Sequence, residues 1–164
     1  MRRVHNPGRA AAVLAGVITM AGLLVTAQTA QAGTTDVRSD VLTYTNRERA
    51  AHGCGPLVRN AALDRAAQGH ASDMASYNYF SHSSRDGRSP FDRIRQAGYP
   101  SDTGRAENIA AGQPTAQRVV QGWMNSAGHR ANILNCSYRS IGVGYGYGGG
   151  TTYKHYWVQN FGTR

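Results

Sequence analysis

The chain has 164 residues, with 18 Lys and Arg against 9 Asp and Glu and a formal net charge of +9. This length suits a single domain with a substantial core. The arginines are scattered along the chain, which is unlike the clustered basic patch of a nucleic-acid-binding protein, so we expect no nucleic-acid partner.

The N-terminus has the order of a secretory signal peptide. Basic residues come first, an apolar run follows at residues 10–25, and Ala30-Gln31-Ala32 provides a small-residue cleavage site. The apolar run is shorter than the roughly 20 residues that a membrane-spanning helix needs. We therefore expect a signal peptide at 1–32, a short leader at 33–39 and a single extracellular domain at 40–164, with no transmembrane anchor after cleavage. A retained membrane anchor is the alternative.

Cys54 and Cys136 are the only cysteines. Export would place them in an oxidising compartment, which favours a disulfide bond over two buried free thiols. Such a bond would close a long loop and stabilise the fold by roughly 4 kcal/mol. Zinc binding through Cys136 is not expected, because no CxxC partner stands near it.

Two helices are predicted early in the domain. The first covers residues 40–52 and stops at Gly53. The second begins after Asn60, a good N-cap residue, and continues to about Tyr77. The spacing of its apolar residues places His70 on the inward face of this helix.

Two shorter helices are predicted next. Ser89, Pro90 and Asp92 form a helix start, and the helix that follows is expected to turn Phe91 and Ile94 inward and to stop at Gly98. The second opens at Pro114 and ends near Asn125, with an apolar stripe made by Ala116, Val119, Val120, Trp123 and Met124. Residues 126–138 are then expected to form a turn.

The last part of the domain has the pattern of a β-hairpin. Residues 141–147 alternate large residues with glycines, which predicts a strand with one nearly bare face that another element can approach closely. Residues 148–152 are expected to form the hairpin loop and 153–161 the partner strand. Helices followed by a hairpin that needs covering indicate a layered α+β domain.

The common hydrolase and nucleotide-binding motifs are missing from the sequence, since it has no HExxH, GxSxG, Walker or dinucleotide-binding motif. Three polar residues stand in apolar surroundings instead: His82, Glu107 and His129. A buried carboxylate needs a partner, and the two histidines are candidates. The three residues together could hold a divalent metal, or the carboxylate could pair with a protonated imidazole. Separate surface or packing roles are the alternative.

Several stretches in order resemble the bacterial secreted branch of the CAP superfamily, which includes the SCP-like and pathogenesis-related class 1 proteins. The resemblance extends over residues 40–161 and rests on TNRERAAHG, LDRAAQGHASDMA, YFSHSSRDG, AENIAAG, WMNSAGHRANIL, IGVGYG and WVQNFG. It implies a three-layer α-β-α sandwich, with a small antiparallel sheet between helices.

The resemblance also implies a cleft lined by two histidines and two acidic residues, in which some relatives bind zinc or another divalent metal. His82, Glu107 and His129 match three of these positions. Ser126 stands where the family has its second glutamate, and a hydroxyl lacks the charge of a carboxylate, so metal binding should be weaker. His70 is either a further cleft residue or a hydrogen-bonded core histidine.

Three classes of function are compatible with the sequence. The first is an extracellular binding module whose cleft takes a lipid, a cell-wall-derived ligand or a weakly bound divalent cation, helped by a groove of aromatic residues: Tyr77, Tyr79, Tyr156 and Trp157. Burial of these four rings in the core is the alternative and the commoner arrangement for aromatic residues. The second is a hydrolase in which His129 or His82 acts as general base, with Glu107 orienting it and Ser126 nearby. The third is a structural or interaction domain without a ligand.

Overall fold

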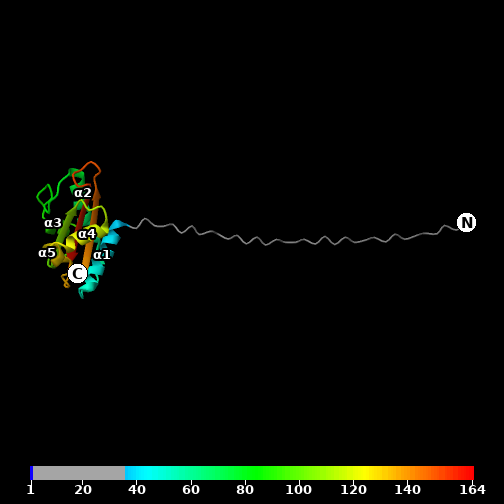
Figure 1. The fold of residues 1–164 in the computed structure, drawn as a ribbon, viewed down its shortest axis with the longest axis horizontal. Helices are drawn as coiled ribbons and strands as arrows, with labels where there is room; N and C mark the ends of the chain where they lie inside the picture. The colour runs from blue at the N-terminus through cyan, green and yellow to red at the C-terminus, as the bar shows by residue number, and fades with distance from the viewer. Residues whose placement is uncertain (2–35) are drawn as a thin grey trace. The chain divides into compact units, whose positions relative to one another are not determined.

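The structure is a computed structural model that describes Met1 and residues 36–164 (Figure 1). Apart from Met1, the predicted signal peptide lies outside the described residues, as does the start of the predicted leader. Within the described part of the chain, no helix has the length and apolar character to cross a membrane.

Residues 36–164 form a mixed α+β domain, which confirms the predicted fold class. Four strands make one sheet in the order β1-β3-β4-β2. The strands are β1 (Val58–Arg59), β2 (Arg105–Ala111), β3 (Ser140–Tyr147) and β4 (His155–Gly162). The helices are α1 (Val37–Ala51), α2 (Ala61–Tyr77), α3 (Pro90–Gln96), α4 (Ala116–Met124) and α5 (Ala127–Ile133). The hairpin β3-β4 is antiparallel, β2 extends it antiparallel to β4, and β1 pairs with β3 in parallel.

Helices cover both faces of the sheet, as the three-layer sandwich requires (Figure 1). On one face, α1, α4 and α5 enclose a core that includes Val41, Trp123 and Ile133 together with side chains of β3 and β4. On the other face, α2 packs its Met74 against Tyr156 and other residues of the sheet. Because successive side chains of a strand point to opposite faces, β4 contributes to both cores, whereas β3 contributes side chains only to the first.

The glycines of β3 determine how closely α2 approaches. A Cβ added at Gly142, Gly144 or Gly146 would overlap the backbone of α2, near Leu63, Ala67 and Ala71 respectively. The bare glycine face predicted from the sequence is therefore confirmed, and the element that packs on it is α2.

The second helix begins as expected, because the side chain of Asn60 accepts hydrogen bonds from two backbone amides of its first turn. The third helix carries the predicted capping box of Ser89 and Asp92. Phe91 was expected to be buried, and this is wrong. It is 47% exposed and lies beside the guanidinium of Arg105, while Ile94 takes the inward position as predicted.

Three further details differ from the sequence-based expectation. Residues 126–138 were predicted as a turn but contain α5. The segment around Glu107 is strand β2, which has no alternating pattern, because both of its faces are buried. The first helix begins earlier than predicted, at Val37, where Asp36 caps it.

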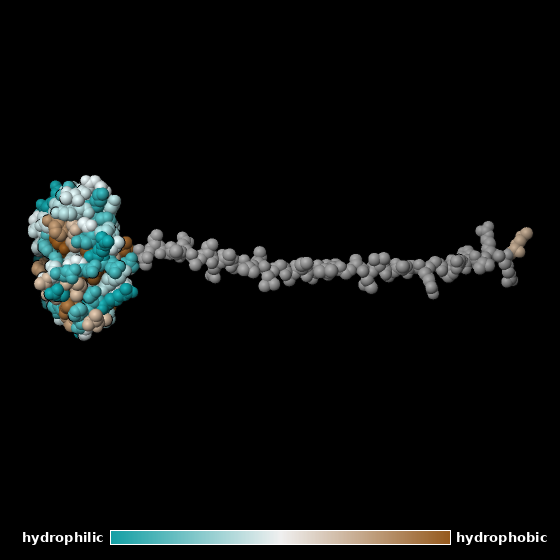
Figure 2. Space-filling model, in the orientation of Figure 1, coloured by the Kyte–Doolittle hydropathy of each residue, from teal (hydrophilic) through white to brown (hydrophobic). Residues whose placement is uncertain are grey.

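Cys54 and Cys136 form the predicted disulfide bond. It joins the segment after α1 to the segment after α5, with the two Cα atoms 4.9 Å apart. The surface of the domain is mainly hydrophilic on the face shown in Figure 2, with separate hydrophobic patches.

Candidate functional site

Glu107 is a buried carboxylate with a partner on each oxygen. It lies on β2, opposite Asn160 of β4, and only 8% of it is exposed. Arg93 Nη2 donates to Oε2 at 2.7 Å, and His82 Nδ1 lies 2.8 Å from Oε1. With the amide of Asn160 oriented so that its nitrogen faces the carboxylate, Asn160 also donates to Oε2, at 3.1 Å. Each oxygen of the desolvated carboxylate thus has at least one hydrogen-bond partner.

Arg93 is a central residue of this site that the sequence did not single out. It belongs to α3 and is 5% exposed. Besides Glu107, it donates through Nη1 to the carbonyl oxygen of His82 at 2.8 Å and to Ser84 Oγ at 3.0 Å. One buried guanidinium therefore fixes both the carboxylate and the loop that carries His82. The local sequence does not distinguish Arg93, because an arginine next to Ile94 on a short helix is typical of a surface position. The only indication in the sequence was that a buried Glu107 carboxylate requires a positively charged or hydrogen-bonding partner.

His82 is the exposed member of the group, with 52% of its side chain accessible to solvent. An ionised carboxylate accepts hydrogen bonds and does not donate them, so the proton in the contact with Glu107 belongs to His82 Nδ1. In the neutral ring, Nε2 then keeps its lone pair. Nε2 has no hydrogen-bond partner among residues 36–164, which leaves it available to a ligand.

His129 lies on α5 and borders a cavity that neither His82 nor Glu107 borders. It is half-buried, and burial together with the nearby ring of His82 lowers the pKa of His129. The ring is therefore neutral at pH 7, with one nitrogen able to accept a hydrogen bond and the other able to donate one.

A cavity of about 270 Å³ opens beside His129. Its wall combines apolar side chains, those of Phe80, Ile109 and Trp123, with polar groups in similar measure, and Gly122 and Ser126 also border it. Ser126 is the N-cap residue of α5 and its side chain makes no capping hydrogen bond. The structure thus brings His129 and Ser126 to one cavity and joins His82 to Glu107, while neither His82 nor Glu107 borders that cavity.

The residues present do not make a complete metal centre. Both oxygens of Glu107 are engaged, one of them by a guanidinium that offsets its charge, so this carboxylate orients His82 and would bind an ion only in competition with these partners. Within the described residues, no group of three His, Cys, Asp or Glu side chains is arranged to hold a metal ion. A cation bound by His82 and His129 would have two imidazoles as ligands, fewer than the three or four protein ligands of zinc sites.

The remaining predicted residues lie elsewhere. His70 is buried in α2, with Nε2 2.8 Å from the carbonyl oxygen of Ser81. Tyr156 and Trp157 belong to the core and are at most 1% exposed, so for these two rings the alternative of core burial holds and the aromatic groove does not. Three other aromatic residues, Tyr77, Phe80 and Tyr153, are exposed, and the ring centroids of Phe80 and Tyr153 lie 5.9 Å apart.

Comparison with known proteins places these features in a family. The model of the cysteine-rich secretory protein family, CAP, matches residues 42–161. The Bacillus subtilis protein YkwD is 43% identical over 121 residues, which are 74% of this chain and 45% of YkwD. The membrane protein YlbC of the same organism is 35% identical over 127 residues, 77% of this chain and 34% of YlbC.

Solved structures of other proteins share the fold of this domain. An extracellular protein of Bacillus anthracis that contains an SCP domain superimposes with a TM-score of 0.69 at 32% identity, over 78% of this chain and 40% of that one. An outer surface protein of Borrelia burgdorferi shares the fold, with a TM-score of 0.68 at 23% identity over 80% of this chain and 95% of that one. The chain spans less than half the length of YkwD and of the Bacillus anthracis protein.

Proposed function

The chain belongs to the CAP family of cysteine-rich secretory proteins, and from this premise we propose that it is an extracellular binding module. Its ligand is a lipid or a cell-wall-derived molecule. An apolar part of the ligand enters the cavity beside His129, and a polar group of the ligand forms hydrogen bonds with His129 and His82. The cavity beside a neutral imidazole is the observation that carries the proposal.

The volume and the lining residues of this cavity limit which part of a ligand can enter it. Its volume of about 270 Å³ is at the lower end for small-molecule sites, so it accommodates one part of a larger ligand. Phe80 favours an acyl segment or an acetyl group, because its exposed ring offers apolar surface from which the ligand displaces water. Ser126 supports this assignment, since its short side chain leaves the space open and adds no charge.

Filling the cavity is the direct test. Gly122 borders it, and a Cβ added there would make only an ordinary contact with Gln113, so Gly122→Phe introduces a ring at the cavity with little cost to the fold. Gln121→Phe adds the same ring at an exposed position of α4 that does not border the cavity. The probes are a fluorescent fatty acid and a soluble muropeptide.

We expect at least one probe to bind the wild type and Gln121→Phe with equal Kd, and Gly122→Phe to bind it at least about tenfold more weakly. Failure of both probes to bind the wild type, or equal binding by Gly122→Phe, would contradict the proposal.

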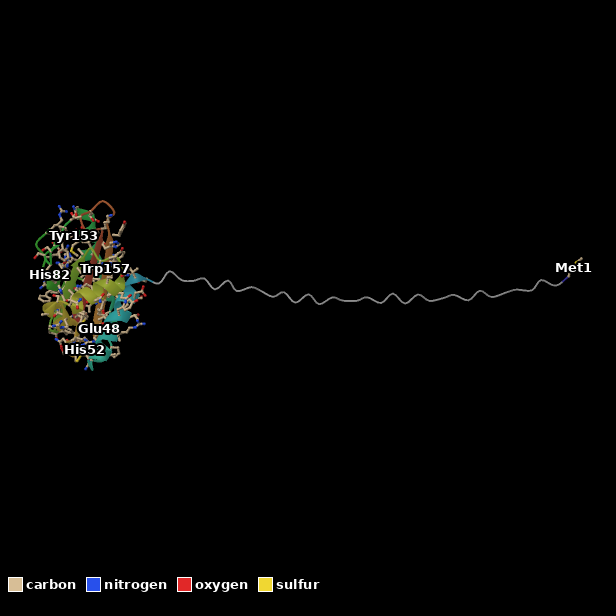
Figure 3. All side chains as sticks on the ribbon, viewed as in Figure 1. Met1, Glu48, His52, His82, Tyr153 and Trp157 are labelled. Carbon is tan, nitrogen blue, oxygen red and sulfur yellow. A yellow bond between two sulfur atoms is a disulfide. The ribbon has the colours of Figure 1, made fainter. Side chains whose placement is uncertain are left out.

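A zinc titration tests whether His82 and His129 bind a divalent cation. Because two imidazoles are the ligands on offer, we expect Kd to be weaker than about 1 µM, measured by calorimetry on metal-free protein. The His82→Ala, His129→Ala double variant tests the site, and His52→Ala is the control, since His52 is exposed and lies in another part of the domain (Figure 3). Tight stoichiometric uptake that only the double variant loses would show that a complete metal site forms.

A hydrolase is the second candidate, and the hydrogen bond from His82 to Glu107 is the observation that favours it. A carboxylate that orients a histidine through Nδ1 leaves Nε2 able to act as a general base. The test is hydrolysis of peptide and ester substrates by the wild type, His82→Ala and His129→Ala. Activity that survives both substitutions would eliminate this mechanism.

A further inference from the structure

Exposed aromatic residues gather at one end of the domain. Seven large apolar residues are exposed within residues 36–164, and four of them are aromatic residues of this end: Tyr77, Phe80, Tyr147 and Tyr153. Their exposed fractions lie between 44% and 61%. Single exposed apolar residues are common on protein surfaces, whereas a group of them marks an interaction site. We call these four residues the aromatic end.

Contacts between α2 and the loop from β3 to β4 hold this group together. Asn78, which follows α2, accepts a hydrogen bond at its Oδ1 from the backbone amide of Thr152 in the loop, at 2.9 Å. The ring centroids of Phe80 and Tyr153 lie 5.9 Å apart, and Tyr147 is the last residue of β3, directly before the loop. The four side chains therefore surround one loop at one end of the sheet (Figure 3).

Two cations accompany the aromatic end. Arg85 and Lys154 are both exposed, and neither forms an ion pair with another described residue. The guanidinium carbon of Arg85 lies 3.8 Å from the centre of the Tyr77 ring, and Lys154 belongs to the loop. The two segments that form this end, residues 77–85 and 147–155, contain no Asp or Glu.

Two acidic residues flank the first of these segments in the sequence. Asp86 pairs with Arg88 at 2.7 Å, so its charge is offset. Asp73 accepts a hydrogen bond from the hydroxyl of Tyr79, which leaves its charge in place. The charge around the aromatic end therefore remains positive even when Asp73 is counted.

This combination of rings and cations complements an anionic lipid bilayer. Tyr and Phe side chains are favourable at the boundary between headgroups and hydrocarbon, where an apolar ring leaves water and a hydroxyl stays wet. Lys and Arg side chains near the surface are attracted to anionic headgroups. The aromatic end offers both kinds of contact.

The ring geometry favours a bilayer over a polysaccharide. A sugar ring stacks on an open aromatic face, and successive sugar units need a row of such faces. The planes of Phe80 and Tyr153 are tilted by 59° to each other, and Arg85 covers one face of Tyr77. A bilayer boundary accepts rings in these orientations, because it is fluid and imposes no fixed stacking geometry.

We propose that the aromatic end docks on the surface of an anionic lipid bilayer. Its four rings enter the boundary between headgroups and hydrocarbon, and Arg85 and Lys154 contact the headgroups. Phe80 also borders the cavity beside His129, so docking brings this cavity to the lipid surface. That last consequence rests on the proposed function, whereas the docking itself does not.

Sedimentation with lipid vesicles tests the proposal. One set of vesicles contains phosphatidylglycerol and phosphatidylcholine in equal parts, and the other contains phosphatidylcholine alone. The chain used begins at Gly33, because the apolar run at 10–25 would itself bind lipid, and it keeps both cores and the disulfide bond. We expect saturable binding to the anionic vesicles that weakens with added salt, and binding to phosphatidylcholine that is at least about tenfold weaker.

Two double variants each remove one component of the surface. Tyr77→Ser, Tyr147→Ser removes two exposed rings that do not border the cavity beside His129. Arg85→Gln, Lys154→Gln removes the two cations. Each double variant should bind the anionic vesicles at least about fivefold more weakly than the wild type. Circular dichroism verifies that every variant is folded.

The control for the rings is Val58→Ser, Phe91→Ser, which removes two exposed apolar side chains at the other end of the sheet. Val58 pairs with Ser140, the first residue of β3, and Phe91 lies beside Arg105, the first residue of β2. This variant should bind the anionic vesicles as the wild type does.

The control for the cations is Arg47→Gln, Arg139→Gln. Both arginines are exposed. Arg139 directly precedes β3, and Arg47 precedes Glu48, which lies at the end of the domain away from Tyr153 (Figure 3). Removing these two charges should weaken vesicle binding less than about twofold, because the effect of a charge falls off within a Debye length of the membrane.

The proposal is overturned if the wild type shows no saturable binding to anionic vesicles, if it binds both sets of vesicles equally, or if the control variants lose as much binding as the test variants. Binding to purified insoluble peptidoglycan that Tyr77→Ser, Tyr147→Ser abolishes would assign this end to a polysaccharide instead.

The Gly122→Phe variant separates this proposal from the proposed function. It should bind anionic vesicles as the wild type does, whether or not the cavity beside His129 takes a ligand. Conversely, Tyr77→Ser, Tyr147→Ser should bind the soluble probes of that cavity with the Kd of the wild type, because neither residue borders it.

Discussion

Glu107 connects most of the polar residues discussed above. Its charge lies in the interior of the domain, where an unpaired carboxylate would be very unfavourable. The guanidinium of Arg93 on one oxygen and the imidazole of His82 on the other offset this cost. Because His82 is held in this way, one buried residue determines which nitrogen of an exposed ring stays free of protein contacts among the described residues.

Removing the positive partner of Glu107 should destabilise the fold strongly. Arg93→Met leaves a buried carboxylate without its cation and frees the loop of His82, and we expect the free energy of unfolding to fall by about 3–5 kcal/mol. Urea denaturation measures this change. Arg95→Met is the control on the same helix, because Arg95 pairs with Asp92 at the surface and should contribute less than about 1 kcal/mol. Similar losses in both variants would contradict this account of Arg93.

At the scale of single residues, the sequence predicted that Glu107 requires a partner but did not identify Arg93 as that partner. The apolar surroundings of Glu107 predicted that the carboxylate needs a partner, and His82 is one of its partners. Arg93 was missed because the chain has many arginines and none differs from the others in its local sequence. Only the tertiary fold, which brings α3 next to β2, selects one of them.

Among the elements, α2 depends most on a specific pattern in another part of the chain. Its backbone lies against the glycine face of β3, so the helix and the strand approach more closely than side chains would allow. The same helix contributes His70 to one cavity and Met74 to the core. The position of α2 against the sheet therefore depends on the absence of side chains at alternate residues of β3.

A single methyl group should disrupt this contact. Gly144→Ala would push a Cβ into the backbone of α2 near Ala67, and we expect a loss of about 3 kcal/mol or more in the free energy of unfolding. Gly69→Ala makes the same change within α2, where nothing lies within 4 Å, and should stabilise the protein by about 0.5–1 kcal/mol. Thermal denaturation of the pair provides the measurement, and equal effects would show that the glycine face is not a constraint.

The elements with a regular pattern could be predicted, and those without one could not. The hairpin β3-β4 was recognised because glycines alternate with large residues, and α2 because its apolar residues recur at helical spacing. Strand β2 is buried on both faces and rich in alanine, so it shows no alternation. Helix α5 is short, contains Gly128 and begins directly after α4, and its tertiary contacts outweigh its weak propensity.

At the scale of the whole domain, the disulfide bond connects two segments that are distant in the sequence. Cys54 and Cys136 are 82 positions apart, so the bond removes much of the freedom of the unfolded chain. We expect the Cys54→Ser, Cys136→Ser double variant to lose about 4 kcal/mol in the free energy of unfolding, with the midpoint of urea denaturation as readout. A loss below about 1 kcal/mol would contradict this role.

One ion pair links the loop of His82 to the interior of the domain. Arg93 borders a cavity of about 420 Å³ between α2 and α3 and also holds Glu107, which in turn holds His82. The cavity beside His129 is separate from this series of contacts, because neither His82 nor Glu107 borders it.

The central claim is that Glu107 holds His82 with its proton on Nδ1 and leaves Nε2 open to a ligand. Long-range ¹H–¹⁵N correlation spectra of the histidine rings, recorded at about pH 8, where imidazoles are ordinarily neutral, test this most directly. We predict a protonated Nδ1 and a bare Nε2 for His82 in the wild-type protein. A proton on Nε2 with a bare Nδ1 would contradict the account.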